Sequence, residues 1–180
     1  MRIFKENTSL LVIDMQERLV PVMAEKELLV NNCITLIKGI KTLEMPLLYT
    51  QQYSKGLGET IPSVSALFEG IPVIEKSSFS CCDEDMFLSG FKALERNVVI
   101  ICGIETHVCV MQTAVDMLDN GFLPVIVENC TTSRNLNDKA IAIRRLMQEG
   151  AIITTYESIL FELCRYSGSA EFKAISALVK

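Results

Sequence analysis

A thiol, a carboxylate and an ammonium each follow a short apolar run, and together they could carry out hydrolysis. They are Cys109, Asp14 and Lys76. A thiol hydrolase needs a nucleophile, a carboxylate that takes the thiol proton and returns it to a leaving group, and a cation near the thiolate. It also needs donors for the oxyanion of a tetrahedral intermediate, which backbone N–H groups of the turn Ile104–Cys109 could supply. The sequence therefore indicates nucleophilic catalysis by a cysteine.

The segment around Cys109 changes from a strand pattern to a helix pattern. After Gly103 the apolar residues recur at spacings of three and four, at Val108, Met111, Val115 and Leu118, which predicts a helix. Thr106 is a plausible N-cap, and it places Cys109 in the first turn. The unpaired N–H groups and the dipole of a first turn favour a thiolate. His107 lies two residues from Cys109 and points elsewhere on a helix, so we expect it to have a structural or rim role.

The elements that must position these side chains alternate along the chain. We expect strands at 9–13, 46–50, 72–75, 98–101, 122–127 and 151–154, and helices at 27–43, 83–95, 108–118, 138–149, 156–163 and 169–179. Residues 51–70 are expected to form a long loop with one helical turn, and 130–137 a polar loop. This alternation predicts an α/β fold: a parallel six-stranded sheet between two layers of helices. With the Rossmann-like strand order 3-2-1-4-5-6, Asp14 and Cys109 face each other at the switch point.

Composition excludes several classes of function. The chain has 180 residues and no linker or repeat, so we expect a single domain over 1–180. A net charge of −5 without a basic cluster argues against nucleic acid as a partner. No apolar run is long enough to cross a membrane, and no leader pattern begins the sequence. Seven cysteines without a Cys-x-x-Cys pair favour a reduced, cytoplasmic protein. The single histidine cannot supply a multi-histidine metal site, and we expect no metal and no cofactor.

Four motifs spread along the chain resemble the isochorismatase-like cysteine hydrolase superfamily. They are LLVIDMQ, IEKSSFS, GIETHVCV and GAIITTYES, while QYSKGLGET resembles the branch of isochorismatase-domain-containing proteins. The resemblance implies a triad of Asp14, Lys76 and Cys109. It also implies a cis peptide bond between Ile104 and Glu105, and an oxyanion hole made by the Glu105 and Cys109 N–H groups. The predicted strand order relies on the same resemblance.

The sequence differs from two related families at residues that decide the reaction. Family nicotinamidases carry an Asp-x-His pair and a further His after the second strand, which bind a metal, whereas residues 51–55 here read QQYSK. True isochorismatases resemble this chain but lack the nucleophilic cysteine, which is present here as Cys109. We expect Gln16, Tyr53 and Phe79 to line the substrate site, although the two aromatic rings could equally be packing residues. The resemblance further implies a homo-oligomer, whose partner subunit could complete the pocket.

These observations predict a metal-independent cysteine hydrolase that cleaves a C–N bond, of the amide type, in a small molecule through a thioester-type intermediate. An alternative from another class is a catalytically silent family member that serves as an oligomeric binding or scaffold protein. A dinucleotide-binding oxidoreductase fits the sheet but not the sequence, because VIDMQERL stands where Gly-x-Gly-x-x-Gly would follow the first strand.

Overall fold

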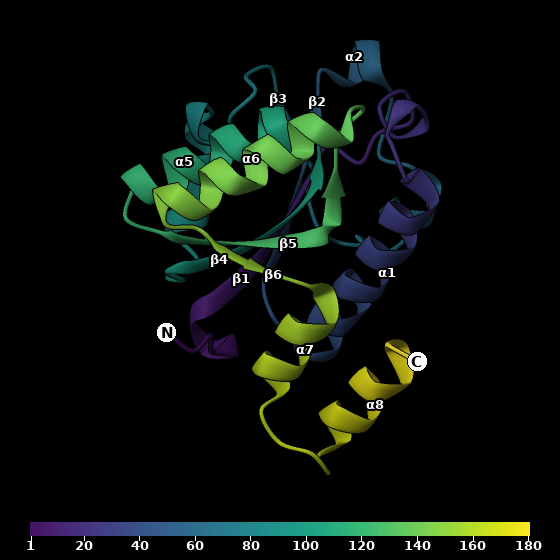
Figure 1. Ribbon diagram of the computed structural model, residues 1–180, viewed down its shortest axis with the longest axis vertical. Helices are drawn as coiled ribbons and strands as arrows, with labels where there is room; N and C mark the ends of the chain where they lie inside the picture. The colour runs from purple at the N-terminus through teal and green to yellow at the C-terminus, as the bar shows by residue number, and fades with distance from the viewer.

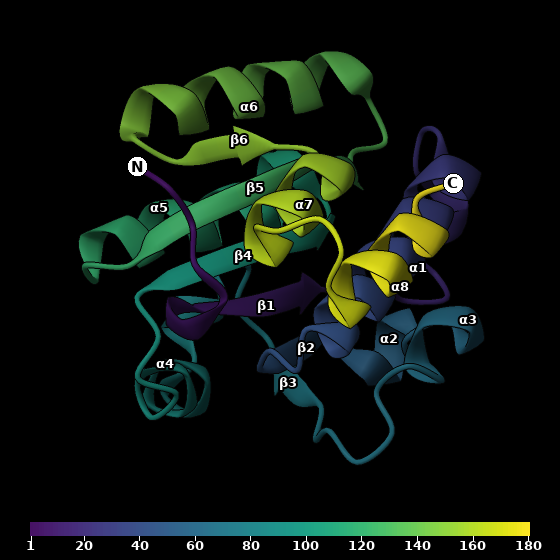
Figure 2. The same ribbon diagram turned by 90° about the horizontal axis from the view of Figure 1, so that it is seen from below.

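A sheet of six parallel strands forms the centre of the computed structural model, which describes residues 1–180. The strands are β1 (Thr8–Ile13), β2 (Leu47–Gln52), β3 (Ile74–Lys76), β4 (Val98–Ile104), β5 (Leu123–Thr132) and β6 (Ile152–Thr154). Their order is β3-β2-β1-β4-β5-β6, and every neighbouring pair is parallel. The predicted fold class and strand order are confirmed, and β1 and β4 lie side by side at the centre (Figure 2).

Helices cover both faces of this sheet (Figure 1). They are α1 (Lys26–Thr42), α2 (Ser54–Leu57), α3 (Pro62–Ser65), α4 (Asp85–Lys92), α5 (Met111–Asp119), α6 (Leu136–Glu149), α7 (Tyr156–Cys164) and α8 (Ala170–Leu178). Short 3₁₀ turns occur at Lys5–Asn7, Val20–Val22 and Cys81–Asp83. Helices α1, α7 and α8 pack on one face and α4, α5 and α6 on the other. No helix is long and apolar enough to span a membrane.

The alternation of side chains along β1 explains why both faces are covered. Leu10 and Val12 point into the core beneath α1, whereas Leu11 and Ile13 point into the core beneath α4, α5 and α6. All four side chains are buried, and burying one such side chain contributes roughly 1.5–3 kcal/mol. The part of β1 from Leu10 to Ile13 is apolar at every position and is stable only between two layers, which places β1 in the interior of the sheet.

Tertiary pairing changes two elements relative to the sequence-based expectations. Strand β5 continues to Thr132, into the expected polar loop, because Thr131 and Thr132 pair with Gly103 and Ile104 beyond a register irregularity. In addition, β2 extends to Gln52, and the expected long loop contains the two short helices α2 and α3. Both changes add ordered backbone at the carboxyl edge of the sheet, where the reactive side chains lie.

The nucleophile turn differs from the expected helix start. Residues Thr106–Val110 form one π-helical turn, called η4, and α5 begins only at Met111. Thr106 is not the N-cap, which is Glu105, and no side chain caps this turn. The Thr106 hydroxyl instead lies 2.8 Å from the Thr131 hydroxyl, which donates to the Gly103 carbonyl oxygen at 2.8 Å. The hydroxyl pair links the turn to β5, so the expected capping role of Thr106 is wrong.

Candidate active site

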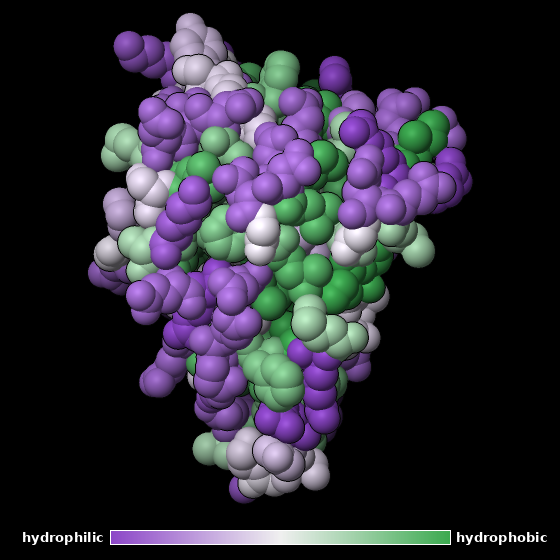
Figure 3. Space-filling model, turned by 90° about the vertical axis from the view of Figure 1, so that its left-hand side faces the viewer, coloured by the Kyte–Doolittle hydropathy of each residue, from purple (hydrophilic) through white to green (hydrophobic).

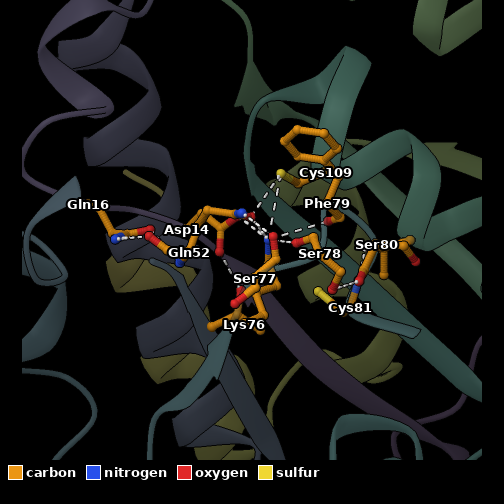
Figure 4. Close-up of polar contacts among 12 residues, drawn as sticks. Asp14, Gln16, Gln52, Lys76, Ser77, Ser78, Phe79, Ser80, Cys81 and Cys109 are labelled. Carbon is orange, nitrogen blue, oxygen red and sulfur yellow. Dashed lines mark hydrogen bonds and ion pairs between the residues drawn. The ribbon is translucent and has the colours of Figure 1, made fainter. Parts of the chain in front are cut away.

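A buried ion pair joins the ends of β1 and β3. Lys76 Nζ lies 2.7 Å from Asp14 Oδ2, and both side chains are fully buried. The other carboxylate oxygen, Oδ1, accepts a hydrogen bond from the Thr50 hydroxyl at 2.7 Å. Breaking a buried pair from one side leaves an unpaired charge and costs about 3–5 kcal/mol. The two ions therefore hold each other in place (Figure 4).

Cys109 completes this arrangement from the turn after β4. Its sulfur lies 3.7 Å from Lys76 Nζ, and 7% of the residue is exposed. The close approach of β4 to β1 depends on Gly103, which has φ +110°. A Cβ atom at this position would lie 2.0 Å from the Ile13 carbonyl oxygen, so only glycine fits. The structure thus brings together all three side chains that the sequence singles out.

The electrostatic environment keeps Cys109 protonated. Burial, followed by the charge of Asp14, raises the pKa of the Cys109 thiol to about 12, although Lys76 acts in the opposite direction. A hydrogen bond to Asp14 raises it further. The expectation that a helix first turn and a cation favour a thiolate is wrong, because the Lys76 charge is already paired with Asp14 and the thiol is buried. The resting group is therefore a protonated thiol beside the Asp14 carboxylate.

Lys76 remains charged in this environment. Burial by itself lowers its pKa, but attraction to the Asp14 carboxylate outweighs burial, so the pKa is raised. Carbonyl oxygens of Ser78 and Phe79 accept from Nζ at 3.1 and 3.3 Å. Fixed acceptors therefore surround the ammonium next to the sulfur.

Gln52 is a site residue that the sequence analysis missed. Its Oε1 accepts a hydrogen bond from Lys76 Nζ and lies 3.9 Å from Cys109 Sγ. Its Nε2 donates to the Ser77 carbonyl oxygen at 2.8 Å. The signal in the sequence is a polar residue close to the end of the second expected strand, but Gln52 lies two residues beyond the expected end of that strand, within the expected loop. The Gln52 side chain therefore bridges β2, Lys76 and the loop after β3.

The three residues expected to bind substrate have different surroundings. Gln16 is fully buried, and its Nε2 donates to the carbonyl oxygens of Gln52 at 2.9 Å and Gly58 at 2.7 Å. Its Oε1 accepts from the Gln52 N–H at 2.7 Å. The side-chain amide of Gln16 is therefore hydrogen-bonded to the end of β2 and does not face a substrate. Tyr53 and Phe79 are 58% and 56% exposed, respectively. They are available at the surface, as a substrate contact requires.

The turn that carries the expected oxyanion donors is held from its outer side. The peptide bond between Ile104 and Glu105 is cis. The Glu105 carboxylate accepts from the Arg134 backbone N–H at 3.0 Å and pairs with its guanidinium at 3.2 Å. His107 Nδ1 lies 2.9 Å from the Ser133 hydroxyl, so the imidazole is engaged away from the thiol. These contacts place Glu105 and His107 in supporting positions around Cys109.

The donor set beside the thiol does not fit the metal of the nicotinamidases. Gln52 Oε1 accepts a hydrogen bond from Lys76 Nζ, and Gln51 Nε2 donates to the Thr60 hydroxyl at 3.0 Å. No group of three or more His, Cys, Asp or Glu side chains is arranged to hold a metal ion. A polar cavity of about 160 Å³ does exist beside Glu128 and Lys139, but it contains none of the three reactive residues. This cavity therefore lies apart from the candidate active site.

Several known proteins resemble this chain in sequence and in fold. The Isochorismatase domain profile matches residues 8–158. Isochorismatase domain-containing protein 2A of Mus musculus is 34% identical over 180 residues, covering 99% of this chain and 85% of the mouse protein. A solved structure described as the MAR1 ribonuclease from Caenorhabditis elegans is 33% identical, with a TM-score of 0.94 over 99% of this chain and 92% of that one. The YcaC gene product from Escherichia coli, described as an octameric hydrolase of unknown specificity, is 25% identical, with a TM-score of 0.94 over 99% of this chain and 89% of that one. The chain thus belongs to the isochorismatase-like hydrolase family.

Proposed function

We propose that this protein is a metal-independent cysteine hydrolase that cleaves a small amide-type C–N bond. The observation that carries the proposal is the convergence of a buried Asp14–Lys76 ion pair on the Cys109 thiol, with Nζ 2.7 Å from the carboxylate and 3.7 Å from the sulfur. A structural ion pair would not need a thiol beside it, and a structural thiol would not need a buried lysine. The combination supplies a nucleophile, a base and a cation in one place.

In the first half of the reaction, Asp14 takes the thiol proton as Cys109 Sγ attacks the carbonyl carbon. With a thiol pKa of about 12, proton removal and C–S bond formation must proceed together. Lys76 then balances the negative charge that spreads over the sulfur and the carboxylate. The tetrahedral intermediate collapses when the C–N bond breaks, and Asp14 returns the proton to the leaving nitrogen. The products of this half are ammonia or an amine and a thioester on Cys109.

In the second half, Asp14 takes a proton from a water molecule as that water attacks the thioester carbon. The C–S bond breaks, the carboxylic acid leaves, and the proton on Asp14 returns to the sulfur. We assign stabilisation of both oxyanions to the N–H groups of Glu105 and Cys109, which belong to the turn held by the Thr106–Thr131 hydroxyl pair. One water is consumed and one C–N bond is hydrolysed in each cycle.

The immediate surroundings favour a small, uncharged substrate. The only ions in contact with the thiol, Asp14 and Lys76, neutralise each other, which leaves no free charge to bind an ionic group next to the scissile bond. The rings of Tyr53 and Phe79 are exposed and are proposed to contact the apolar part of the substrate. Gln16 is proposed as a positioning residue that holds Gln52.

We also propose a homo-oligomer in a reducing, cytoplasmic environment. Helix α6 leaves Leu136, Ile141 and Met147 between 45% and 59% exposed. Hydrophobic residues also gather in patches among polar ones on the face of the molecule seen in Figure 3. Exposed apolar surface of this kind marks an interaction site. The structurally similar Escherichia coli protein is described as octameric. All seven cysteines are free thiols, in agreement with a reducing compartment.

A panel of small primary amides and ureides, read by release of ammonia, tests the proposed reaction. Cys109→Ala is the control, and it must abolish ammonia release from any amide that wild type hydrolyses. Trapping with hydroxylamine tests for the thioester, because it converts the acyl group into a hydroxamate. Since one similar structure is described as a ribonuclease, single-stranded RNA is assayed in parallel. RNA cleavage that survives Cys109→Ala, with no ammonia from any amide, would refute the proposal.

A further inference from the structure

The ammonium of Lys76 is held by a loop whose own anchor lies outside the site. Lys76 ends β3, and the chain then turns through Ser77–Ser80. Two carbonyl oxygens of this loop, from Ser78 and Phe79, point back at Lys76 Nζ at 3.1 and 3.3 Å. The loop also carries the exposed ring of Phe79 (Figure 4). Its conformation therefore affects both the charge beside the sulfur and the entrance to the thiol.

The Glu84 carboxylate accepts hydrogen bonds from the N–H groups at the start of this loop. Glu84 Oε1 accepts from the Ser77 N–H at 2.9 Å and from the Ser78 N–H at 3.1 Å. The Ser78 hydroxyl lies 2.8 Å from the same oxygen and 2.7 Å from the Ser80 carbonyl oxygen, and its single proton serves one of them at a time. Hydrogen bonds from the Ser77 and Ser78 N–H groups lower the pKa of Glu84, which keeps the carboxylate ionised at neutral pH.

We propose that Glu84 is a positioning residue of the active site, which fixes the Ser77–Ser80 loop so that its carbonyl oxygens hold the Lys76 ammonium beside Cys109. An ionised acceptor makes hydrogen bonds about twice as strong as a neutral one. Glu84 accepts from the Ser77 and Ser78 N–H groups, so it fixes the chain directly before the two peptides whose Ser78 and Phe79 carbonyl oxygens face Lys76. Glu84 makes no hydrogen bond or ion pair with Lys76 or Cys109, so its hydrogen bonds act on them through the loop, and the Lys76 charge also lowers the pKa of Glu84. The inference rests on the proposed function, since this ammonium matters to a reaction only if Cys109 is the nucleophile.

The loop supplies two of the five acceptors that enclose the Lys76 ammonium. Three protons on Nζ face the oxygens of Asp14, Gln52, Ser78 and Phe79 as well as the Cys109 sulfur. With the loop in place, the ammonium is enclosed and shielded from water. If the loop moves, two of these acceptors leave and water reaches Nζ. Exchange of the ammonium protons with water therefore reports directly on the role proposed for Glu84.

The experiment measures that exchange by ¹H–¹⁵N NMR on protein labelled at lysine, with the Lys76 ammonium signal assigned from its absence in Lys76→Met. We expect slow exchange in wild type and exchange at least about tenfold faster in Glu84→Ala. Glu84→Gln keeps an oxygen in place and should fall between wild type and Glu84→Ala. Asp83→Ala is the matched control, because Asp83 is an exposed neighbouring carboxylate with no hydrogen bond or ion pair, and it should behave as wild type.

A second measurement follows the loop itself. The chain contains no tryptophan, so Phe79→Trp introduces a single fluorescent reporter on the loop. In this background Glu84→Ala should increase quenching of Trp fluorescence by acrylamide, and Asp83→Ala should not. If Glu84→Ala does not fold, Glu84→Asp replaces it, because a side chain one methylene shorter cannot reach both N–H groups and should raise both readouts severalfold.

Unchanged exchange of the Lys76 ammonium in the Glu84 variant would overturn the inference, even if quenching of the loop reporter increases. An equal effect of Asp83→Ala would also overturn it, because the cause would then be net charge. Neither readout depends on turnover. Failure of the proposed reaction is seen separately, as absence of ammonia release from wild type or its persistence in Cys109→Ala.

Discussion

Replacing Asp14 by asparagine should change the reactivity of Cys109 and the turnover of the enzyme in opposite directions. Asp14 raises the pKa of the thiol both by its charge and by a hydrogen bond, in addition to the larger effect of burial. Removing a charge that lies next to a titratable group shifts the pKa of that group by about 1–3 units. The Lys76 ammonium, 3.7 Å from the sulfur, then becomes available to the thiolate. We expect the thiol pKa to fall by about two units.

The size of the rate change follows from two opposing factors. A fall of about two units makes the thiolate about 100-fold more abundant at neutral pH. A less basic thiolate is also less nucleophilic, and a Brønsted coefficient of about 0.4–0.5 reduces its rate constant about tenfold. Alkylation of Cys109 by iodoacetamide should therefore be about tenfold faster in Asp14→Asn. Turnover should instead fall by about 10²–10⁴, because no group remains to carry the proton to the leaving nitrogen.

The assay is peptide-resolved alkylation against pH, alongside ammonia release. In wild type the rate should rise about tenfold per pH unit between pH 7 and 9, because the thiol pKa of about 12 lies well above this range. The variant leaves Lys76 buried without its anion, which costs about 3–5 kcal/mol, so both proteins are compared below the thermal midpoint of the variant. Thr50→Val removes only the hydroxyl that donates to Asp14 and serves as the control. If Asp14→Asn slows alkylation together with turnover while still folded, Asp14 orients Lys76 and is not the base.

Four further predictions follow from the same geometry. Lys76→Met removes the cation that opposes the rise in the Cys109 pKa, so alkylation of Cys109 at neutral pH should slow about tenfold or more. An unchanged alkylation rate would show that Lys76 does not act on the thiol. Gln52→Glu adds a negative charge where Oε1 now lies 3.9 Å from the sulfur, so alkylation should slow, whereas the uncharged Gln52→Met should not slow it. Activity should persist in chelator, since Gln51 and Gln52 are engaged with Thr60 and Lys76; loss that zinc restores would contradict this. Light scattering should give a homo-oligomer, and a stable monomer at micromolar concentration would contradict the proposed assembly.

The positions of the three reactive residues follow from local patterns. Asp14, Lys76 and Cys109 each end or follow an apolar run, and parallel strands bring their carboxyl ends to one edge of the sheet. Alternation in strands and the period of helices are local properties, so the layers and the strand number could be derived from the chain alone. The strand order was also predicted, with the help of family resemblance.

Contacts between segments far apart in the sequence decided the roles of Gln52 and Gln16 and the pKa of Cys109. Gln52 is a site residue because β2 extends far enough for its side chain to reach Lys76. Gln16 is buried and holds the end of β2 because its hydrogen-bond partners, 36 and 42 residues away in the sequence, lie next to it in the fold. The Cys109 pKa was mispredicted for the same reason. A helix first turn is visible in the sequence, but the pairing of Lys76 with Asp14 and the desolvation of the thiol exist only after folding. The sequence by itself determined which groups could react, and the tertiary structure determined their protonation, because pKa values depend on burial and on charges brought within a few ångströms.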